Sequence, residues 1–466
     1  MAKILPGKKA CTTNPLKMSA PIGAALALLG IDRTVPLLHG SQGCTAFGLV
    51  LFVRHFRETI PLQTTAMNEV TTILGGLENV EQAVLNIKKR ADPGLIGICS
   101  TGITEAKGDD VGGFLKGFRQ QHPELGDTEV VFVPTPDFVG GFSDGWAKAV
   151  KCLVEALAAP SKVRTPWQVN ILAGCHLTVG DIEEIRDTVE SFGLTPIIVP
   201  DLSGSLDGHI PETFLPHTLG GTRLADIKRM GASALTIAIG EAMRPAAEAL
   251  EKKTGVPFRL FETLTGLAAS DAFIGLLSDV SQNEVPSKLK RQRSQLQDAM
   301  LDGHFYFGEQ KIAIAAEPDL LYTLSHFFAD MGAKVVCAVA PQDALILEKV
   351  ATETVQIGDL QDFEENATSA DLLVAHSHGR QAAGRLGIPF FRAGIPTFDR
   401  LGAAHRVSVG YRGTRNLIFE VGNVFMEQLE QHERHLNSPA GPAAIRAPEP
   451  RPDAVAAVDA AAVAGH

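Results

Sequence analysis

The residue types best suited to chemistry lie in the run His39-Gly40-Ser41-Gln42-Gly43-Cys44. An apolar run at 34–38 predicts a buried strand, and the glycines after it allow a tight turn that brings a thiol to its end. Ligand sites in open α/β sheets lie beyond the carboxyl ends of strands. An apolar helix expected at 46–57 would bury the thiol on one side. Cys44 is therefore either a metal ligand or a core thiol, because free cysteines are among the most buried residues.

The number and spacing of the cysteines limit what Cys44 can bind. One thiolate cannot hold an iron–sulfur cluster, which normally needs four cysteine ligands. The chain contains no Cys-x-x-Cys pair, which excludes a zinc ribbon and a self-contained ferredoxin motif. The six cysteines are at positions 11, 44, 99, 152, 175 and 337. If Cys44 is a ligand, the other ligands must come from elsewhere.

Three smaller groups of polar residues have alternative interpretations. Asp109 and Asp110 precede an expected helix at 111–121, where acidic groups favour the helix N-terminus; a paired-carboxylate acid/base site or a magnesium site is the alternative. Cys175-His176 offers a soft ligand pair, although adjacent residues of an extended segment point to opposite faces. His376 and His378 would share one face of a strand, but the sequence shows no third ligand nearby.

The order of the expected elements predicts the fold. Strands alternate with helices, a rhythm typical of parallel sheets with right-handed crossovers. We predict an α/β protein of three Rossmann-like domains with parallel sheets flanked by helices, since 466 residues are too many for one core. A helix at 22–29 is expected to end at Gly30 in a left-handed cap. The expected strands are 34–38, 95–99, 129–133, 168–173, 196–199, 234–239, 257–261, 311–315, 334–339, 354–357, 371–375 and 388–393.

The predicted domain boundaries follow from composition. The N-terminal α/β domain covers 1–160, and a polar, proline-bounded connection at 160–166 leads to a second domain at 161–300. The third domain covers 301–437 and ends in a helix. The alanine- and proline-rich tail at 438–466 is expected to be disordered.

Composition also excludes several classes of function. A formal net charge of −11 argues against a general binder of nucleic acid or anionic membranes. The basic residues Lys288, Lys290, Arg291 and Arg293 are expected to form a solvated helix face. The first residues lack the apolar core of a signal peptide, and no apolar stretch has the roughly 18–20 residues of a spanning helix. We therefore expect a cytoplasmic protein with reduced thiols.

Several longer motifs resemble the nitrogenase molybdenum–iron protein family over nearly the whole chain. Within it, the chain resembles the β-like subunit of the scaffold on which the iron–molybdenum cofactor is matured. The matching runs are 38–44, Arg54-His55-Phe56, Gly75-Gly76-Leu77-Glu78-Asn79, Ser100-Thr101 to Gly108-Asp109-Asp110, 135–140, and Leu386-Gly387-Ile388-Pro389 through Arg392, Gly394, Pro396, Asp399 and Arg400.

The resemblance implies a role for Cys44. The catalytic β subunit brings three cysteines to an eight-iron P-cluster. In this chain Cys44 matches the second of them, whereas Ser19 or a neighbour and Gly102 stand at the first and third positions. The single thiolate would complete a [4Fe–4S] cluster whose other ligands come from the α-like partner. Asp137 falls where the catalytic subunit has a serine beside its cluster, and a structural turn role is its alternative.

The resemblance also implies partners. The α-like subunit NifE would form an α2β2 heterotetramer with this chain and would bind most of the iron–molybdenum cofactor precursor. NifB would donate the precursor, the iron protein NifH would dock transiently, and the catalytic molybdenum–iron protein would accept the product. Leu74 is hypothesised to belong to the NifH contact. No side chain of this chain is expected to be catalytic.

Two other classes of function stay open. The first is an enzyme, the β subunit of a nitrogenase-like reductase. A catalytic nitrogenase would need cysteines at the positions of Ser19 and Gly102, and a dark-operative chlorophyll-pathway reductase resembles this chain less at 75–79 and 399–400. The second is a plain binding module in which Cys44 is a core thiol.

Overall fold

The computed structural model describes residues 1–7, 9, 12–210 and 212–436, without the side chains of residues 74 and 430–436. Cys11, the tail at 438–466 and the side chain of Leu74 therefore lie outside the described part. Residues Met1–Gly422 form one compact unit. A second unit begins at Asn423, within helix α16 (Gly410–Leu436).

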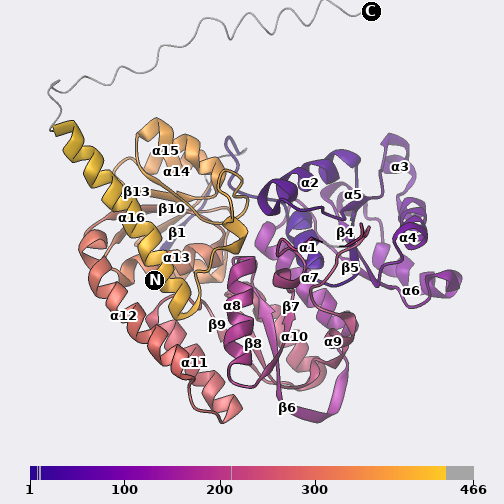
Figure 1. Cartoon of the computed structure of the whole chain (residues 1–466). Coiled ribbons are helices and arrows are strands. Elements are labelled where there is room, and N and C mark those ends of the chain that lie inside the picture. Colours follow the sequence, from indigo (N-terminus) through magenta and orange to yellow (C-terminus); the bar gives the residue numbers. More distant parts are fainter. Residues whose placement is uncertain (8, 10–11, 211, 437–466) are drawn as a thin grey trace, which may run out of the picture. The chain divides into compact units, whose positions relative to one another are not determined.

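Three separate sheets, each covered by helices, make up this unit (Figure 1). Every strand pair described in these sheets is parallel. The predicted class, an α/β fold with three parallel sheets flanked by helices, is confirmed. Parallel sheets bury both faces, which explains the continuous apolar runs that identified the strands.

The first sheet has the strand order β3-β2-β4-β5. Its central strands β2 and β4 are buried along their whole length. Helix α1 packs on them, while apolar residues of α4 and α6 form a core with the same two strands. The elements are β2 (Thr34–His39), β3 (Gln63–Thr64), β4 (Leu95–Ser100), β5 (Glu129–Val133), α1 (Ala20–Leu29), α2 (Gln42–Phe56), α3 (Glu69–Leu74), α4 (Leu77–Ala91), α5 (Gly102–Lys107), α6 (Val111–Gln121), the 3-10 helix η1 (Pro123–Leu125) and α7 (Phe142–Leu157).

Helix α1 ends at Gly30, but the predicted left-handed cap is wrong, because Gly30 has a φ of −81°. The glycine is needed for a different reason. A Cβ at this position would lie 2.5 Å from Cβ of Pro200, so only glycine allows the chain after α1 to approach that segment.

The second sheet has the order β7-β6-β8-β9. The predicted connection at 160–166 is wrong, because β6 begins at Pro160 and pairs with β8, with register shifts after Pro160 and Thr165. Most of this first half of β6 is exposed, which explains its polar sequence. The elements are β6 (Pro160–Ala173), β7 (Thr195–Val199), β8 (Gly231–Ile239), β9 (Phe258–Phe261), α8 (Val179–Glu190), η2 (Leu202–Gly204), α9 (Leu224–Arg229), η3 (Glu241–Met243), α10 (Arg244–Thr254), α11 (Leu267–Ser281) and α12 (Ser287–Phe307).

The third sheet has the order β1-β12-β11-β10-β13-β14. Its edge strand β1 comes from the N-terminus, which the predicted domain 1–160 had included; the boundaries of the three domains otherwise stay a prediction. The elements are β1 (Lys3–Leu5), β10 (Lys311–Ala315), β11 (Lys334–Ala340), β12 (Thr354–Ile357), β13 (Leu372–Ala375), β14 (Phe390–Arg392), α13 (Pro318–Asp330), η4 (Leu345–Lys349), α14 (Leu360–Asn366), η5 (Ser377–Gly379), α15 (Arg380–Leu386) and η6 (Ala403–His405).

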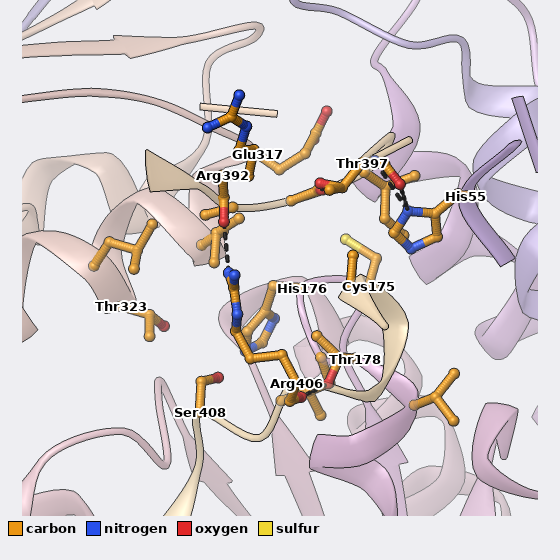
Figure 2. A pocket seen from close by; sticks show the side chains of 18 of the residues that line it. His55, Cys175, His176, Thr178, Glu317, Thr323, Arg392, Thr397, Arg406 and Ser408 are labelled. Atoms are coloured by element: carbon orange, nitrogen blue, oxygen red, sulfur yellow. Dashed lines mark hydrogen bonds between the residues drawn. The ribbon is translucent and has the colours of Figure 1, made fainter. Parts of the chain in front are cut away.

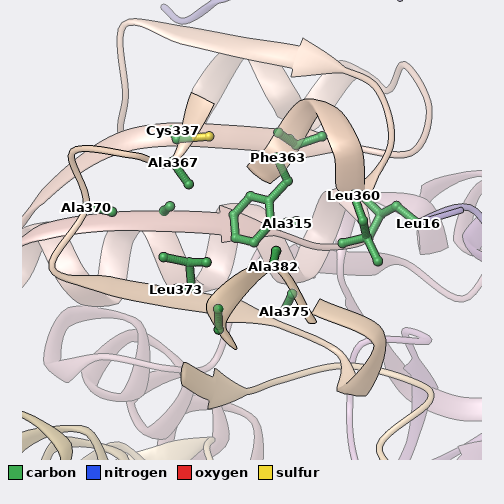
Figure 3. Close-up of a cluster of buried hydrophobic side chains, with 13 residues drawn as sticks. Leu16, Ala315, Cys337, Leu360, Phe363, Ala367, Ala370, Leu373, Ala375 and Ala382 are labelled. Atoms are coloured by element: carbon green, nitrogen blue, oxygen red, sulfur yellow. The ribbon is translucent and has the colours of Figure 1, made fainter. Parts of the chain in front are cut away.

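A core on one face of the third sheet joins distant parts of the chain (Figure 3). Phe363 of α14 lies at its centre, and Leu16 reaches it from the segment before α1. Cys337 belongs to this core and is buried. The N-terminal segment is thus attached to the third sheet through both β1 and Leu16.

The basic residues of α12 and the apolar character of the helices were also predicted from the sequence. Lys288, Lys290 and Arg291 are exposed on α12, as predicted, while Arg293 pairs with Asp271 at 2.7 Å. Among the described residues, no helix combines the length and the apolar character needed to span a membrane.

Candidate functional site

Cys44 lies in the first turn of α2, directly beyond the carboxyl end of β2. Helix α2 begins at Gln42 with Ser41 as its N-cap, so the expected start at residue 46 is four residues too late. The expected burial of the thiol is also wrong, because Cys44 is exposed and Phe47, one turn later, is 67% exposed. The apolar residues of α2 that face the core are instead Leu51, Phe52 and Phe56.

The position at a helix start suits a negatively charged sulfur. The free N–H groups and the dipole of a helix N-terminus favour a thiolate, the form in which cysteine binds metal. The hydroxyl of Ser41 lies 3.6 Å from Sγ of Cys44 and donates a hydrogen bond to it. A metal-ligating thiolate at Cys44 would have the Ser41 hydroxyl as a hydrogen-bond donor.

The neighbouring strand ends contribute no second accessible thiol. Cys99 is fully buried in β4, and burial raises the pKa of its thiol far above the ordinary range. Among the described cysteines, Cys175 and Cys337 are buried, while Cys152 of α7 is half-buried. Cys44 is the one exposed cysteine of the described part of the chain.

The resemblance places the other two cluster cysteines at Ser19 or a neighbour and at Gly102. Neither of these two residues is a cysteine, and each lies at the start of a helix. Ser19 is the N-cap of α1, and Gly102 is the first residue of α5. The N–H of Gly102 donates to Oδ2 of Asp137 at 3.2 Å, so this aspartate holds the loop after β5 to the start of α5. Burial raises the pKa of Asp137, and the hydrogen bond from Gly102 opposes that shift. The contact gives Asp137 a structural role.

The donor set therefore fits one ligand to a cluster and not a complete site. No three histidine, cysteine, aspartate or glutamate side chains are grouped so as to hold a metal ion anywhere in the described residues. A [4Fe–4S] cluster at Cys44 would need its other ligands from another chain.

Exposed apolar side chains surround the end of the first sheet that carries Cys44. They follow the carboxyl ends of β2, β4 and β5, which in a parallel sheet lie at one edge. We call this set the apolar rim: Phe47, Val50, Val53, Ile103, Phe138 and Val139. Phe47 and Phe138 are 67% and 65% exposed. Large apolar side chains left exposed near one sheet end are the kind of surface that partner proteins cover.

A buried histidine lies beneath the Cys44 turn. His39, the last residue of β2, is completely buried, and its Nδ1 is 3.1 Å from Oγ1 of Thr65. Its Nε2 is 3.6 Å from Oδ2 of Asp109. The sequence pattern paired Asp109 with Asp110 and included His39 only in a motif; a histidine at the end of an apolar strand was the available sign of the contact between His39 and Asp109.

The two adjacent carboxylates Asp109 and Asp110 have separate partners. Asp110 caps α6 by accepting from the N–H of Gly113 at 2.8 Å, which confirms the predicted role at a helix start. Asp109 is turned toward His39 and accepts from the N–H of Gly76 at 3.2 Å. The pair does not act as one carboxylate site.

Cys175 and His176 do lie together, contrary to the alternating geometry expected from the sequence. They occupy a turn after β6 and line one enclosed pocket of about 80 Å³ (Figure 2). Arg406 crosses this pocket and donates to the carbonyl of Arg392 at 2.5 Å. Burial lowers the pKa of His176 to about 4 and raises that of Cys175, so both are uncharged near neutral pH. The pair packs between chain segments and forms no metal site.

His376 and His378 also differ from the expected arrangement. His376 is the N-cap of η5, after β13, and His378 lies within η5; their ring centroids are 5.2 Å apart and their planes are nearly perpendicular. Burial lowers the pKa of His376 to about 4. Nδ1 of His376 accepts from the N–H of His378, which gives it a turn-forming role.

Comparison with known proteins identifies the family. The sequence profile described as nitrogenase component 1 type oxidoreductase matches residues 19–426. The chain belongs to this family. The resemblance predicted from the motifs is confirmed.

Two named relatives and one solved structure show which members of the family this chain is similar to. The "Nitrogenase iron-molybdenum cofactor biosynthesis protein NifN" of Bradyrhizobium diazoefficiens is 56% identical over 93% of this chain and 94% of its own. The protein of the same name from a Nostoc species is 48% identical over 94% of this chain and 98% of its own. A solved structure described as "Nitrogenase Cp1 at pH 6.5" has a TM-score of 0.87 and 30% identity, covering 93% of this chain and 98% of that chain.

Proposed function

We propose that this protein is the β-like subunit of a scaffold on which the iron–molybdenum cofactor of nitrogenase is assembled. The similarity to proteins named for the biosynthesis of this cofactor supports the role, because it is high and covers nearly the whole chain. The alternative, a catalytic or reductase subunit, is less favoured, because the resemblance places Ser19 or a neighbour and Gly102 where the catalytic β subunit has cluster cysteines.

The specific task proposed for the chain is to supply Cys44 as one ligand of a [4Fe–4S] cluster shared with an α-like partner. The observation that supports it is the exposure of Cys44 at the start of α2, since no other cysteine among the described residues is exposed. When bound, such a cluster accepts and donates single electrons. Ser41 and the α2 N-terminus would stabilise the ligand thiolate.

The partners proposed here come from the resemblance, and the apolar rim supports a stable protein contact near Cys44. We infer an α2β2 assembly with NifE, which would hold most of the cofactor precursor. NifB as precursor donor, NifH as a transient partner and the catalytic molybdenum–iron protein as acceptor complete this proposal. We propose a cytoplasmic location, where thiols stay reduced.

The decisive experiment compares wild type, Cys44→Ala and Cys152→Ser, each co-expressed with the α-like partner and purified without oxygen. Iron and sulfide content and the EPR spectrum of the dithionite-reduced complex are measured. We expect Cys44→Ala to lose the [4Fe–4S] signal and about four iron atoms per shared site. Cys152→Ser, which changes a half-buried thiol of α7, should match wild type.

Two results would contradict parts of this proposal. Unchanged iron and an unchanged spectrum in Cys44→Ala would remove the ligand role. A chain that never associates with an α-like subunit, with or without Cys44, would remove the shared site.

A further inference from the structure

The contacts of His39 join three segments that are distant in sequence. Its carbonyl accepts from the hydroxyls of Thr101 at 2.9 Å and Thr104 at 3.3 Å, which follow β4. Its ring contacts Thr65, and the same threonine hydroxyl accepts from the N–H of Gly40 at 3.1 Å. Through Thr65 the histidine ring is thus tied to the backbone that begins the Cys44 turn.

The neighbours of the ring decide where its proton lies. A lone pair on Nε2 would face the carboxylate of Asp109, which is repulsive, so Nε2 carries the hydrogen. Nδ1 then accepts from the hydroxyl of Thr65. Burial lowers the pKa of His39, while Asp109 opposes that shift. The hydroxyl, the imidazole and the carboxylate form one chain of contacts, in which the 3.6 Å between Nε2 of His39 and Oδ2 of Asp109 is a close charge contact and not a hydrogen bond.

Asp109 extends this chain to the glycine loop before α4. Its Oδ2 accepts from the N–H of Gly76, and its Oδ1 lies 3.9 Å from Nζ of Lys107. Lys107 in turn donates to the carbonyl of Thr71 in α3 at 3.1 Å. The carboxylate therefore holds α3 and the loop at 75–76.

Gly76 shows how closely the two segments approach. A Cβ at this position would lie 2.6 Å from Cε1 of His39 and 3.0 Å from Oδ2 of Asp109. The loop backbone therefore rests directly on the imidazole, and any side chain at residue 76 would displace it.

We propose that His39 and Asp109 are positioning residues for Cys44: they lock the turn that carries this thiol to α3 and the glycine loop at 75–76. The inference rests on the proposed function, because that function gives Cys44 its ligand role. The contacts of His39 and Asp109 themselves do not depend on a bound cluster. A contact or displacement at α3 is thereby transmitted to the Cys44 turn through one carboxylate and one imidazole.

The test uses the full chain without cluster and measures the alkylation rate of Cys44 by iodoacetamide, with peptide mapping to separate the cysteines. We compare Asp109→Ala and His39→Gln with Asp110→Ala, a matched control that removes the adjacent carboxylate. Loosening of the turn is expected to change the Cys44 rate by about threefold or more in the first two variants. Hydrogen exchange of residues 40–46 should rise with it, while Asp110→Ala stays within about twofold of wild type.

Wild-type rates and exchange in both Asp109→Ala and His39→Gln would overturn the inference, and so would an equal change in Asp110→Ala. If either variant fails to fold, Thr65→Val removes the hydroxyl that links His39 to Gly40 and takes its place. In the cluster-loaded complex, Asp109→Ala should shift the EPR g-values at unchanged iron content. The iron analysis of Cys44→Ala tests the proposed function separately, because it does not depend on these variants.

Discussion

Burial controls the charge of several individual residues. His55 of α2 is buried, and its Nδ1 accepts from the N–H of Thr397, in the segment after β14, at 3.0 Å. Burial lowers the pKa of His55 from 6.5 to about 4, so the ring is neutral in the folded chain. The opposite case is Glu317, whose pKa burial raises to about 7. These groups make stability depend on pH between 4 and 7.

The sign for His55 follows from its two pKa values. Its folded pKa of about 4 lies below the ordinary 6.5, so acidification protonates the unfolded chain first. The contribution of His55 to the free energy of unfolding is complete above pH 6.5 and falls as the pH drops toward 4. From pH 7 to pH 5 we expect His55 to cost about 2 kcal/mol of unfolding free energy.

Urea unfolding of wild type and His55→Asn at pH 7 and pH 5 measures this effect. Between pH 7 and pH 5, His55→Asn should lose about 2 kcal/mol less unfolding free energy than wild type. His304→Asn, at an exposed position on α12, should lose as much as wild type. A buried carboxyl such as Glu317 has the opposite effect: because its folded pKa is raised, its contribution to stability is lost as the pH rises. Such carboxyls are present in wild type and in both variants, so their effect cancels in the comparison. Equal pH dependence in all three would disprove the assignment.

At the scale of elements, α1 and α7 pack with their backbones in direct contact. A Cβ at Gly145 would lie 1.8 Å from the carbonyl oxygen of Ala20, and one at Gly23 would lie 1.9 Å from that of Phe142. This contact fixes the start of α1, whose N-cap is Ser19. Small residues were visible in the sequence of α1, but their partner helix was not.

Gly145→Ala is expected to destabilise the chain by about 3 kcal/mol or more, because the two backbones must separate. Gly117→Ala in α6 is the matched control, since a Cβ there meets nothing within 4 Å. It should be neutral or stabilise by up to about 1 kcal/mol through helix propensity. Thermal melts of the two variants measure the difference. A Gly145→Ala melt equal to wild type would show that the helices can separate at little cost.

At the scale of the whole chain, the N-terminus completes a sheet formed by residues more than 300 positions later. The register places Lys3 opposite Thr354 and Leu5 opposite Gln356. The N–H of Ala2 also donates to the carbonyl of Glu348 at 2.8 Å. Strand β1 thereby covers the edge of β12.

Deleting residues 1–6 should therefore affect the third sheet and spare the first. We expect hydrogen exchange of β12 to accelerate by about tenfold or more, while β2 keeps its protection. Lys3→Ala, which removes an exposed side chain and keeps the backbone pairing, serves as control. Faster exchange in β2 with an unchanged β12 would contradict the observed pairing.

Periodicity and composition alone determined the fold class and most strands. Helix α6 and strand β5 match their expected bounds, because local apolar patterns depend on neighbours in sequence. The glycine-rich turn also identified Cys44 as a candidate ligand. The resemblance to the family implied that cluster thiols are absent at Ser19 or a neighbour and at Gly102. That Cys44 serves as a ligand stays a prediction.

Long-range packing decided the rest. The exposure of Cys44, the turn that unites Cys175 and His176, and the pairing of β1 depend on segments far away in the chain. The His39–Asp109 contact is the clearest case, because it joins residues 70 positions apart at one buried point. Local propensity carries no information about such contacts; they arise when sheets and helices bury their shared surfaces.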